Sequence, residues 1–319
     1  MRATAKASVS ALALIGLIGA AAAQAPKPEN PKVRFAVGGK AGIYYRPVTA
    51  TERLGYFKDA GLDVEMLDVA SGARALQSIV GGSADVGTGN LDHTLQLQAK
   101  GQTIVGVVQY GDVPGFVMAM IKSKSDAFKT PRDLKGMKIG VTSPGSATHF
   151  MAAYLMVRNG LKPDEASFIG TGATSTAVAA ARRAEIDAIV SSDPMISVID
   201  QSGLVKIIYD TRTKEGTQAV YGGPYSGGIV YVTQAYLDKN PNTVQALVTA
   251  FVRTAKWIAT HSPDDIAKLM PEDFALGDPA IYRQAIAAAK PGYSSHGRFL
   301  ELSPILGDGL IGQAAAVAG

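Results

Sequence analysis

Two matching segments, about a hundred residues apart, constrain the fold of this chain more than any other feature. The first copy comprises Val33 to Gly42 and Ser71 to Asn90, and the second comprises Lys138 to Ser146 and Ala173 to Asp193. Each copy has the pattern of a strand, a small-residue loop, a helix and a second strand that follows an aspartate. The repeat therefore predicts two similar α/β lobes.

Aligning Asp85 with Asp187 places Asn90 opposite Ser192, so the two copies end at equivalent loops. In α/β sheets, ligands bind outside the carboxyl ends of the strands, and both lobes would contribute such loops to a shared cleft. We therefore predict an α/β protein with two lobes, mostly parallel sheets flanked by helices and a ligand cleft between the lobes.

The first 23 residues have the pattern of a secretion signal. Arg2 and Lys6 precede an apolar run that ends in small residues and is too short to span a bilayer. We expect cleavage after Ala23, because cleavage after Ala25 would leave Pro26 directly beyond the cut. Residues 24–32, rich in proline and charge, are expected to form a disordered leader to a soluble, exported protein.

The chain contains no cysteine. This excludes disulfides, thiolate catalysis, cysteine metal sites and a lipid-anchor cysteine, and it favours a free periplasmic protein. We expect this protein to be a monomer. The net charge of +4 includes two cations of the predicted signal, and no basic cluster is present in the rest of the sequence. This charge balance argues against a nucleic-acid partner.

Two glycine-rich clusters mark where the chain passes between the predicted lobes. The first is residues 111–115 and the second is residues 221–228. Lobe one is then 33–110 together with 228–319, and lobe two is 111–227. Apolar residues after Pro241 recur at helical spacing, which predicts helices packed on lobe one.

Small polar residues occur where predicted strands meet predicted helices. Helix starts carry free N–H groups and partial positive charge, so several of them converging in a cleft would hold a small anion. For any single loop, ordinary N-capping remains the alternative. The candidate ligand residues in these loops are Ser71, Gly72, Gly89, Asn90, Ser143, Gly145, Ser146, Thr148, Thr171, Thr174, Ser192 and Asp193.

Two cations are further candidates. Arg74 lies in the first turn after Ser71, where a guanidinium fork would suit a sulfonate or a carboxylate. A salt bridge to an acid such as Asp92 is the alternative for Arg74. Lys40, in the loop after the first strand, is the second candidate cation.

Aromatic residues and one histidine complete the candidate set. Tyr44 and Tyr45 follow Gly42 after the first strand, and we expect one of them in the core and the other against an organic ligand. Tyr225 lies in the second glycine-rich cluster. His149 lies just beyond the second small-residue loop and could donate to a ligand.

No pattern in the sequence indicates catalysis, a metal site or a cofactor. The four histidines lack chelating spacing, and His93 is expected on a helix surface or packed. The GDGLIG segment at 307–312 resembles a dinucleotide motif, but too little chain follows it for a βαβ unit. No P-loop, nucleophile elbow or Ser-His-Asp arrangement is visible, so we do not expect an enzyme.

Four segments resemble a known family of transport proteins: Tyr56 to Asp63, Ala75 to Gly87, Asp133 to Val141 and Glu185 to Asp193. They are similar to the periplasmic solute-binding proteins of nitrate, sulfonate and taurine ABC importers, a superfamily that includes binders of thiamine-pyrimidine precursors and of aromatic compounds. The resemblance extends from about Val33 to Val232.

The resemblance implies a type II periplasmic binding protein whose lobes close on a ligand and dock on a membrane permease. It places the ligand loops at 38–45, 71–74, 89–90, 143–149, 171–174 and 192–193. We expect a small organic anion of the alkanesulfonate or taurine class, with nitrate, an aromatic carboxylate or a pyrimidine thiamine precursor as alternatives. An exported hydrolase is the alternative from outside this class.

A related eukaryotic branch makes the thiamine pyrimidine by means of a cysteine-rich motif. The chain has no cysteine and carries a predicted export signal, and both features set that activity aside.

Overall fold

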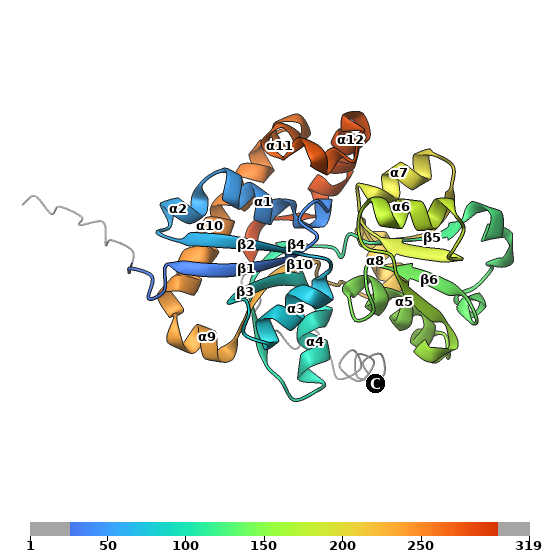
Figure 1. The fold of residues 1–319 in the computed structure, drawn as a ribbon, viewed down its shortest axis with the longest axis horizontal. Helices are drawn as coiled ribbons and strands as arrows, with labels where there is room; N and C mark the ends of the chain where they lie inside the picture. Colours follow the sequence, from blue (N-terminus) through green and yellow to red (C-terminus); the bar gives the residue numbers. More distant parts are fainter. Residues whose placement is uncertain (1–25, 299–319) are drawn as a thin grey trace, which may run out of the picture.

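The computed structural model describes residues 26–298. The predicted signal with its cleavage site after Ala23, the segment at 307–312 and the C-terminal tail lie outside the described residues, as does the His296 side chain. Figure 1 shows two α/β bodies side by side, each with its own sheet. We call them lobe one, which holds α1 to α4 and α9 to α12, and lobe two, which holds α5 to α8.

Lobe one contains a six-stranded mixed sheet with the strand order β11-β4-β10-β3-β1-β2. The strand β1 pairs in parallel with β2 and β3, whereas β10 is antiparallel to both β3 and β4. The strands are β1 (Lys32–Gly38), β2 (Asp63–Val69), β3 (Val86–Asn90), β4 (Ile104–Gly111), β10 (Gly228–Thr233) and β11 (Tyr293–Arg298).

Apolar stripes explain why the helices of lobe one pack on this sheet. Phe251 of α10 contacts Phe35 of β1 and Phe57 of α2, with ring centroids 6.2 and 5.7 Å apart. The helical spacing predicted after Pro241 is confirmed. The helices are α1 (Arg46–Arg53), α2 (Tyr56–Asp59), α3 (Gly72–Val80), α4 (Asp92–Gln98), α9 (Gln234–Lys239), α10 (Pro241–Thr260), α11 (Pro263–Leu269) and α12 (Pro279–Ala289), with short 3-10 turns at Ile43–Tyr45, Glu272–Ala275 and Lys290–Gly292.

Lobe two contains a five-stranded sheet with the order β7-β6-β8-β5-β9. Its strands are β5 (Val117–Ile121), β6 (Lys138–Val141), β7 (Ser167–Gly170), β8 (Ala188–Ser191) and β9 (Val205–Asp210). The helices are α5 (Ala147–Arg158), α6 (Ser175–Arg182), α7 (Met195–Gln201) and α8 (Lys214–Tyr221), with 3-10 turns at Lys122–Ala127, Pro131–Leu134 and Pro163–Glu165.

The repeat seen in the sequence is present in the topology. The order β2-β1-β3-β10-β4 in lobe one corresponds to β7-β6-β8-β5-β9 in lobe two. In each sheet the strand that enters from the other lobe, β10 or β5, runs antiparallel to its neighbours. The fold class is therefore confirmed, with mixed sheets instead of mostly parallel ones, because the entering strand approaches from the opposite end.

The two aspartates that marked the repeat have the same local role. The Asp85 N–H donates to the Arg34 carbonyl at 2.9 Å, and the Asp187 N–H donates to the Lys138 carbonyl at 2.7 Å. Each carboxylate in turn accepts the backbone N–H of the same partner, at 2.9 and 2.7 Å. Each aspartate thus fixes the start of its strand against the neighbouring parallel strand.

The chain passes between the lobes at two adjacent crossings. The Gly227 N–H donates to the Gly111 carbonyl at 3.0 Å, so the crossing after β4 lies beside the crossing before β10. Nearby, Phe116 and Thr211 are joined by three hydrogen bonds of 2.8 to 3.0 Å, which involve both backbones and the Thr211 hydroxyl.

The N-terminal segment is hydrogen-bonded to the start of α10. Within the predicted leader, the Glu29 carboxylate accepts the N–H groups of Asn242 and Thr243 at the start of α10.

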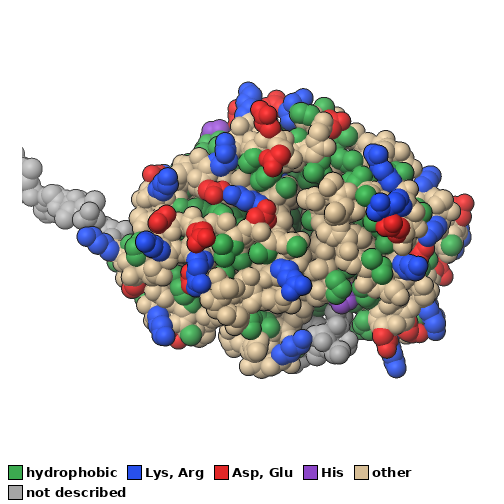
Figure 2. Space-filling model, viewed as in Figure 1, with side chains coloured by type: hydrophobic (Ala, Val, Ile, Leu, Met, Phe, Trp, Pro, Cys, Tyr) green, Lys and Arg blue, Asp and Glu red, His purple; other side chains and the backbone are tan. Residues whose placement is uncertain are grey.

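Figure 2 shows cations and anions interspersed on the face in view. Within residues 26–298, no helix is both long and apolar enough to cross a bilayer.

Candidate functional site

A small cavity of about 30 Å³ lies between the two lobes. The carboxyl ends of four strands border it: Gly38 ends β1, Asn90 ends β3, Thr142 follows β6 and Ser192 follows β8. Ligands of α/β sheets are expected at this edge. The residues that line the cavity are Gly38, Gly39, Gly42, Tyr44, Tyr45, Gly72, Asn90, His93, Phe116, Thr142, Ser146, Ala147, Thr148, Ala173 and Ser192.

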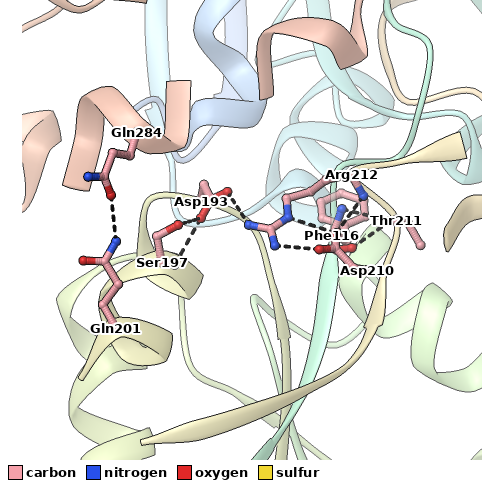
Figure 3. A network of polar contacts seen from close by, with 8 residues as sticks. All are labelled: Phe116, Asp193, Ser197, Gln201, Asp210, Thr211, Arg212 and Gln284. Atoms are coloured by element: carbon pink, nitrogen blue, oxygen red, sulfur yellow. Dashed lines mark hydrogen bonds and ion pairs between the residues drawn. The ribbon is translucent and has the colours of Figure 1, made fainter. Parts of the chain in front are cut away.

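Direct contacts between the lobes surround this cavity. The Ser143 hydroxyl donates to the Ser71 hydroxyl at 2.7 Å. The Ile43 N–H donates to the Asp193 carbonyl at 2.8 Å. Farther out, the Gln201 amide of α7 donates to the Gln284 amide of α12 at 3.1 Å (Figure 3). The lobes are therefore in a closed arrangement.

Two buried polar side chains reach the cavity with unsatisfied atoms. Asn90 is 1 % exposed, and neither its amide nitrogen nor its amide oxygen has a partner at hydrogen-bond geometry among the described residues, although the amide lies close enough to the Asp92 carboxyl to lower the pKa of that carboxyl. The His93 Nδ1 lies 3.2 Å from the Tyr231 hydroxyl, whereas its Nε2 has no partner in residues 26–298. Burial lowers the pKa of the His93 imidazole to about 4, so the ring is neutral at pH 7. Buried polar groups normally have partners, so these atoms are candidates for ligand contacts.

Two glycines make room for the His93 ring. A Cβ at Gly89 would lie 2.3 Å from His93 Nδ1, which no side chain could tolerate. A Cβ at Gly72 would lie 3.0 Å from His93 Cε1 and 3.3 Å from the Tyr45 hydroxyl. The missing side chains at these two positions therefore allow the imidazole to lie under the start of α3.

An aromatic wall closes one side of the cavity. Tyr44 stacks on Phe116 with centroids 5.1 Å apart and meets Tyr45 edge to face at 4.8 Å. The Tyr44 hydroxyl donates to the Gly89 carbonyl at 2.9 Å. Both tyrosines are buried and both line the cavity. We expected one tyrosine in the core and the other against the ligand, whereas both rings border the cavity.

The opposite side of the cavity is formed by hydroxyls at the start of α5. Thr142, Ser146 and Thr148 are linked to one another by hydroxyl hydrogen bonds of 2.8 to 3.0 Å. The start of α3 faces them, with Ser71 as its N-cap. The cavity thus lies between two helix N-termini, and none of its lining residues carries a formal charge at pH 7.

Eight of the predicted ligand residues line the cavity, and three more contact its lining. The eight are Gly42, Tyr44, Tyr45, Gly72, Asn90, Ser146, Thr148 and Ser192. The three are Ser71 and Ser143, which join the two helix starts, and Gly89, which holds the Tyr44 hydroxyl.

Neither of the two predicted cations lines the cavity. Arg74 is exposed and donates to the Gln77 side chain on the same helix at 2.9 Å. The alternative, a salt bridge to an acid such as Asp92, is not formed either, since the Asp92 carboxylate accepts from the Gln96 amide. Lys40 pairs with Glu52, and its N–H donates to the Asp68 carboxylate at 2.8 Å.

The remaining candidates have local partners. The His149 Nδ1 accepts the Gly145 N–H at 3.0 Å, and its ring packs on Phe168. The Thr171 hydroxyl donates to the Val141 carbonyl at 3.1 Å, and Thr174 precedes α6 as its N-cap residue. The Tyr225 ring stacks on the ring of Tyr221 with centroids 4.1 Å apart.

Asp193 belongs to a polar network beside a second cavity of about 40 Å³ (Figure 3). Its carboxylate accepts from the Ser197 hydroxyl at 2.6 Å and from the Arg212 guanidinium at 3.0 Å. The guanidinium also pairs with Asp210. These ion pairs raise the pKa of Arg212 although its partial burial opposes the rise. Tyr44 and Ser192 border both cavities.

Several lining residues were not among the predicted ones. His93 and Phe116 are the most informative, because one supplies an unpartnered nitrogen and the other an aromatic face. The sequence signal that could have identified His93 is the pair of glycines at 72 and 89. Their missing side chains leave space for the imidazole of His93, three residues after Asn90. Phe116 gave no local signal, since its place depends on how lobe two meets lobe one.

Together, two similar lobes and a buried cavity at their strand ends define a protein of the periplasmic-binding-protein fold. A family model described as "NMT1/THI5 like" matches residues 43–266. The chain belongs to the NMT1/THI5-like family. Residues 26–298 contain no cluster of three or more His, Cys, Asp or Glu side chains that could hold a metal ion.

Three relatives illustrate the similarity. A protein of known structure from Bordetella bronchiseptica RB50 is 46 % identical, with a TM-score of 0.85, over 92 % of this chain and 91 % of that one. The alkanesulfonate-binding protein SsuA from Xanthomonas axonopodis pv. citri, bound to MOPS, is 19 % identical, with a TM-score of 0.64, over 83 % and 86 % of the two chains. YtlA of Bacillus subtilis (strain 168) is 22 % identical over 79 % of this chain and 74 % of its own.

Some relatives are named as enzymes. The 4-amino-5-hydroxymethyl-2-methylpyrimidine phosphate synthase THI5 of Saccharomyces cerevisiae is 27 % identical over 141 residues. That match covers 44 % of this chain and 41 % of the yeast protein, so the chain spans less than half of that synthase.

Proposed function

We propose that this protein is the periplasmic solute-binding component of an ABC importer and that it captures a small organic anion of the alkanesulfonate class. The observation that carries the proposal is the cavity between the lobes, which combines two facing helix starts with the unpartnered Asn90 amide. The names of similar structures, the sulfonate-binding SsuA and the nitrate-binding NrtA of Synechocystis PCC 6803, support the same class.

The anionic head would lie between the starts of α3 and α5. Free backbone N–H groups and the hydroxyls of Ser146 and Thr148 would donate to it, and no side-chain cation would be needed. Each charge-assisted hydrogen bond contributes about 1.5–3 kcal/mol, so a few of them account for a micromolar dissociation constant, about −8 kcal/mol. The organic body would pack on Tyr44, Tyr45 and Phe116.

Ligand contacts from both lobes would favour the closed arrangement. Lobe one (33–110 with 228–319) and lobe two (111–227) would rotate about the crossings near 111–115 and 221–228, and the permease would recognise the closed form. A ligand that touches Asn90 on one side and Thr148 on the other gains its full affinity only after closure. In this proposal the protein is a monomer exported by its N-terminal signal.

A second candidate ligand is a neutral heterocycle such as a pyrimidine thiamine precursor. It is favoured by the Asn90 amide, which offers an unused donor and an unused acceptor side by side, next to an aromatic wall. The two candidates differ in charge and can therefore be separated by binding measurements.

The test is a thermal-shift screen of the mature chain, residues 24–319, refolded from denaturant to remove carried ligand. The panel contains alkanesulfonates, taurine, nitrate, aromatic carboxylates and pyrimidines. A ligand at 100 times its dissociation constant adds about 2.7 kcal/mol of stability, and each kcal/mol raises Tm by about 2–4 °C. Shifts with sulfonates support the proposal, whereas shifts with pyrimidines alone support the second candidate. No shift with any compound contradicts both.

A further inference from the structure

The second cavity, of about 40 Å³, is lined by both lobes and by both chain crossings. Gly111 and Gly228 come from the crossings, Ala289 from α12 of lobe one and Arg212 from lobe two. We call it the hinge cavity, because the crossings form part of its wall. A group bound there would contact both lobes at once and would therefore favour the closed arrangement.

The wall of the hinge cavity is suited to an apolar group. Its two charged residues, Asp193 and Arg212, bond to each other at 3.0 Å. The hydroxyls of Tyr110 and Tyr293 bond to oxygen atoms of the protein, each at 2.6 Å. Apart from the two residues shared with the first cavity, every polar side chain of the wall thus has a partner. Cavities whose walls offer no free polar group stay dry and take up apolar molecules.

Tyr44 and Ser192 border both cavities, so they form the partition between them. Tyr44 is the larger of the two, and its position therefore decides whether the cavities join. Its hydroxyl donates to the Gly89 carbonyl within lobe one, whereas its ring stacks on Phe116 of lobe two with centroids 5.1 Å apart. The stacking contact would be lost on separation of the lobes, and the ring would then be free to turn.

Neither cavity alone has room for an organic ligand. Their volumes are about 30 and 40 Å³, whereas an apolar cavity that holds benzene measures about 150 Å³. An anionic head between the starts of α3 and α5 would occupy the first cavity, so the rest of the ligand needs a further volume. The hinge cavity adjoins the first one and has the matching apolar wall.

We propose that the hinge cavity is a second subsite for the same ligand and takes its apolar end, with Tyr44 turned aside so that the two cavities join. The ligand is then an elongated amphiphilic anion. Its head lies at the two helix starts, and its hydrocarbon end lies between Val113 and Ala289. This inference rests on the proposed function, and it adds a requirement for ligand length.

Ligands that share a head and differ in length test the subsite. Isothermal titration would compare ethanesulfonate, butanesulfonate and hexanesulfonate, and the straight-chain carboxylates of the same chain lengths. Each fully buried methylene raises affinity about fourfold. We expect the hexyl member of at least one series to bind tenfold or more tightly than the ethyl member. Equal affinities along both series would overturn the subsite and leave the binding of an organic anion intact, whereas no binding of any member would contradict the proposed function as well.

Ala289→Leu tests where the hydrocarbon chain lies. Ala289 lines the hinge cavity but not the first cavity, and a leucine there would fill the apolar volume. We expect the ratio of hexyl to ethyl affinity to fall to about threefold or less. Ala288→Leu, the same change at the neighbouring exposed residue of α12, is the matched control and should keep the full ratio. An unchanged ratio in Ala289→Leu would overturn the proposal, because the chain would then lie elsewhere.

A crystal structure of the wild type with hexanesulfonate gives a readout that depends on no variant. We expect the chain to pass the displaced ring of Tyr44 and to end beside Val113 and Ala289. A chain that instead points toward Ser71 and Ser143, with the hinge cavity unfilled, would overturn the proposal.

Discussion

At the scale of single residues, Asn90 and Arg74 give opposite expectations for ligand affinity. Asn90→Ala removes the one cavity amide whose donor and acceptor are both free, and we expect a loss of at least tenfold in affinity. Arg74→Ala changes an exposed side chain that contacts Gln77, so affinity should change less than twofold. Titration calorimetry with a hit from the screen measures both variants. Strong loss in Arg74→Ala alone would place the ligand on the outer face of α3.

The neighbouring Asp92 and His93 should give opposite pH dependences of stability. The pKa of Asp92 is raised from 3.8 to about 7, so the folded state keeps a proton that the unfolded state releases, and stability falls as pH rises through this range. The pKa of His93 is lowered from 6.5 to about 4, so stability rises with pH between these values. The tyrosines near them titrate above this window.

Because the two effects oppose each other between pH 4 and 6.5, single substitutions should unmask them. Relative to the wild type, Asp92→Asn should become more stable and His93→Gln less stable as pH rises from 4.5 to 6.5, by at most about 1.4 kcal/mol per unit. Urea unfolding at three pH values measures the slopes. Variants that both keep the wild-type slope would show that neither group titrates as stated.

Residue positions in the site were only partly predictable. In α3 the apolar Ala73, Leu76 and Ile79 recur at helical spacing and are buried, which directs Arg74 and Gln77 to solvent. The apolar spacing in the sequence therefore predicts that the Arg74 side chain faces solvent. By contrast, the contact of Phe116 with Tyr44 joins two lobes, and no local pattern specifies such a contact.

At the scale of elements, the two equivalent aspartates should stabilise their strands by similar amounts. Asp85→Ala and Asp187→Ala each remove a carboxylate that accepts the N–H of a parallel strand, and we expect each to cost about 1–3 kcal/mol of unfolding free energy. Glu185→Ala, which breaks an exposed pair with Arg183, should cost less than about 0.5 kcal/mol. Urea denaturation compares the three, and an effect of Glu185→Ala as large as the others would contradict this role.

The elements themselves were well predicted because their signals are local. The pattern of a strand, a small-residue loop, a helix and an aspartate before the next strand recurs in both copies, and the structure has the same strand order in both sheets. The antiparallel pairing of β10 with β3 and β4 could not be predicted in this way, since β10 is more than a hundred residues distant from both in sequence.

At the scale of the whole molecule, the closed arrangement includes contacts that no ligand would touch. The bond between Gln201 and Gln284 joins α7 to α12 away from the cavity-lining residues. Gln284→Ala should weaken every ligand by the same factor, about two- to fivefold, because it disfavours closure without altering the site. Gln245→Ala, on the exposed face of α10, should have no effect. Titration of two chemically different ligands tests this, and a ligand-dependent factor would contradict it.

The adjacent crossings also determine how the molecule can move. The Gly227–Gly111 hydrogen bond joins the two chain passages, so in the proposed mechanism the lobes would rotate about one axis through these adjacent crossings. Such a rotation would separate Ser71 from Ser143, which lie on opposite lobes. In the proposed mechanism the opening for the ligand would be on the side of these two serines, and the ligand would enter and leave there.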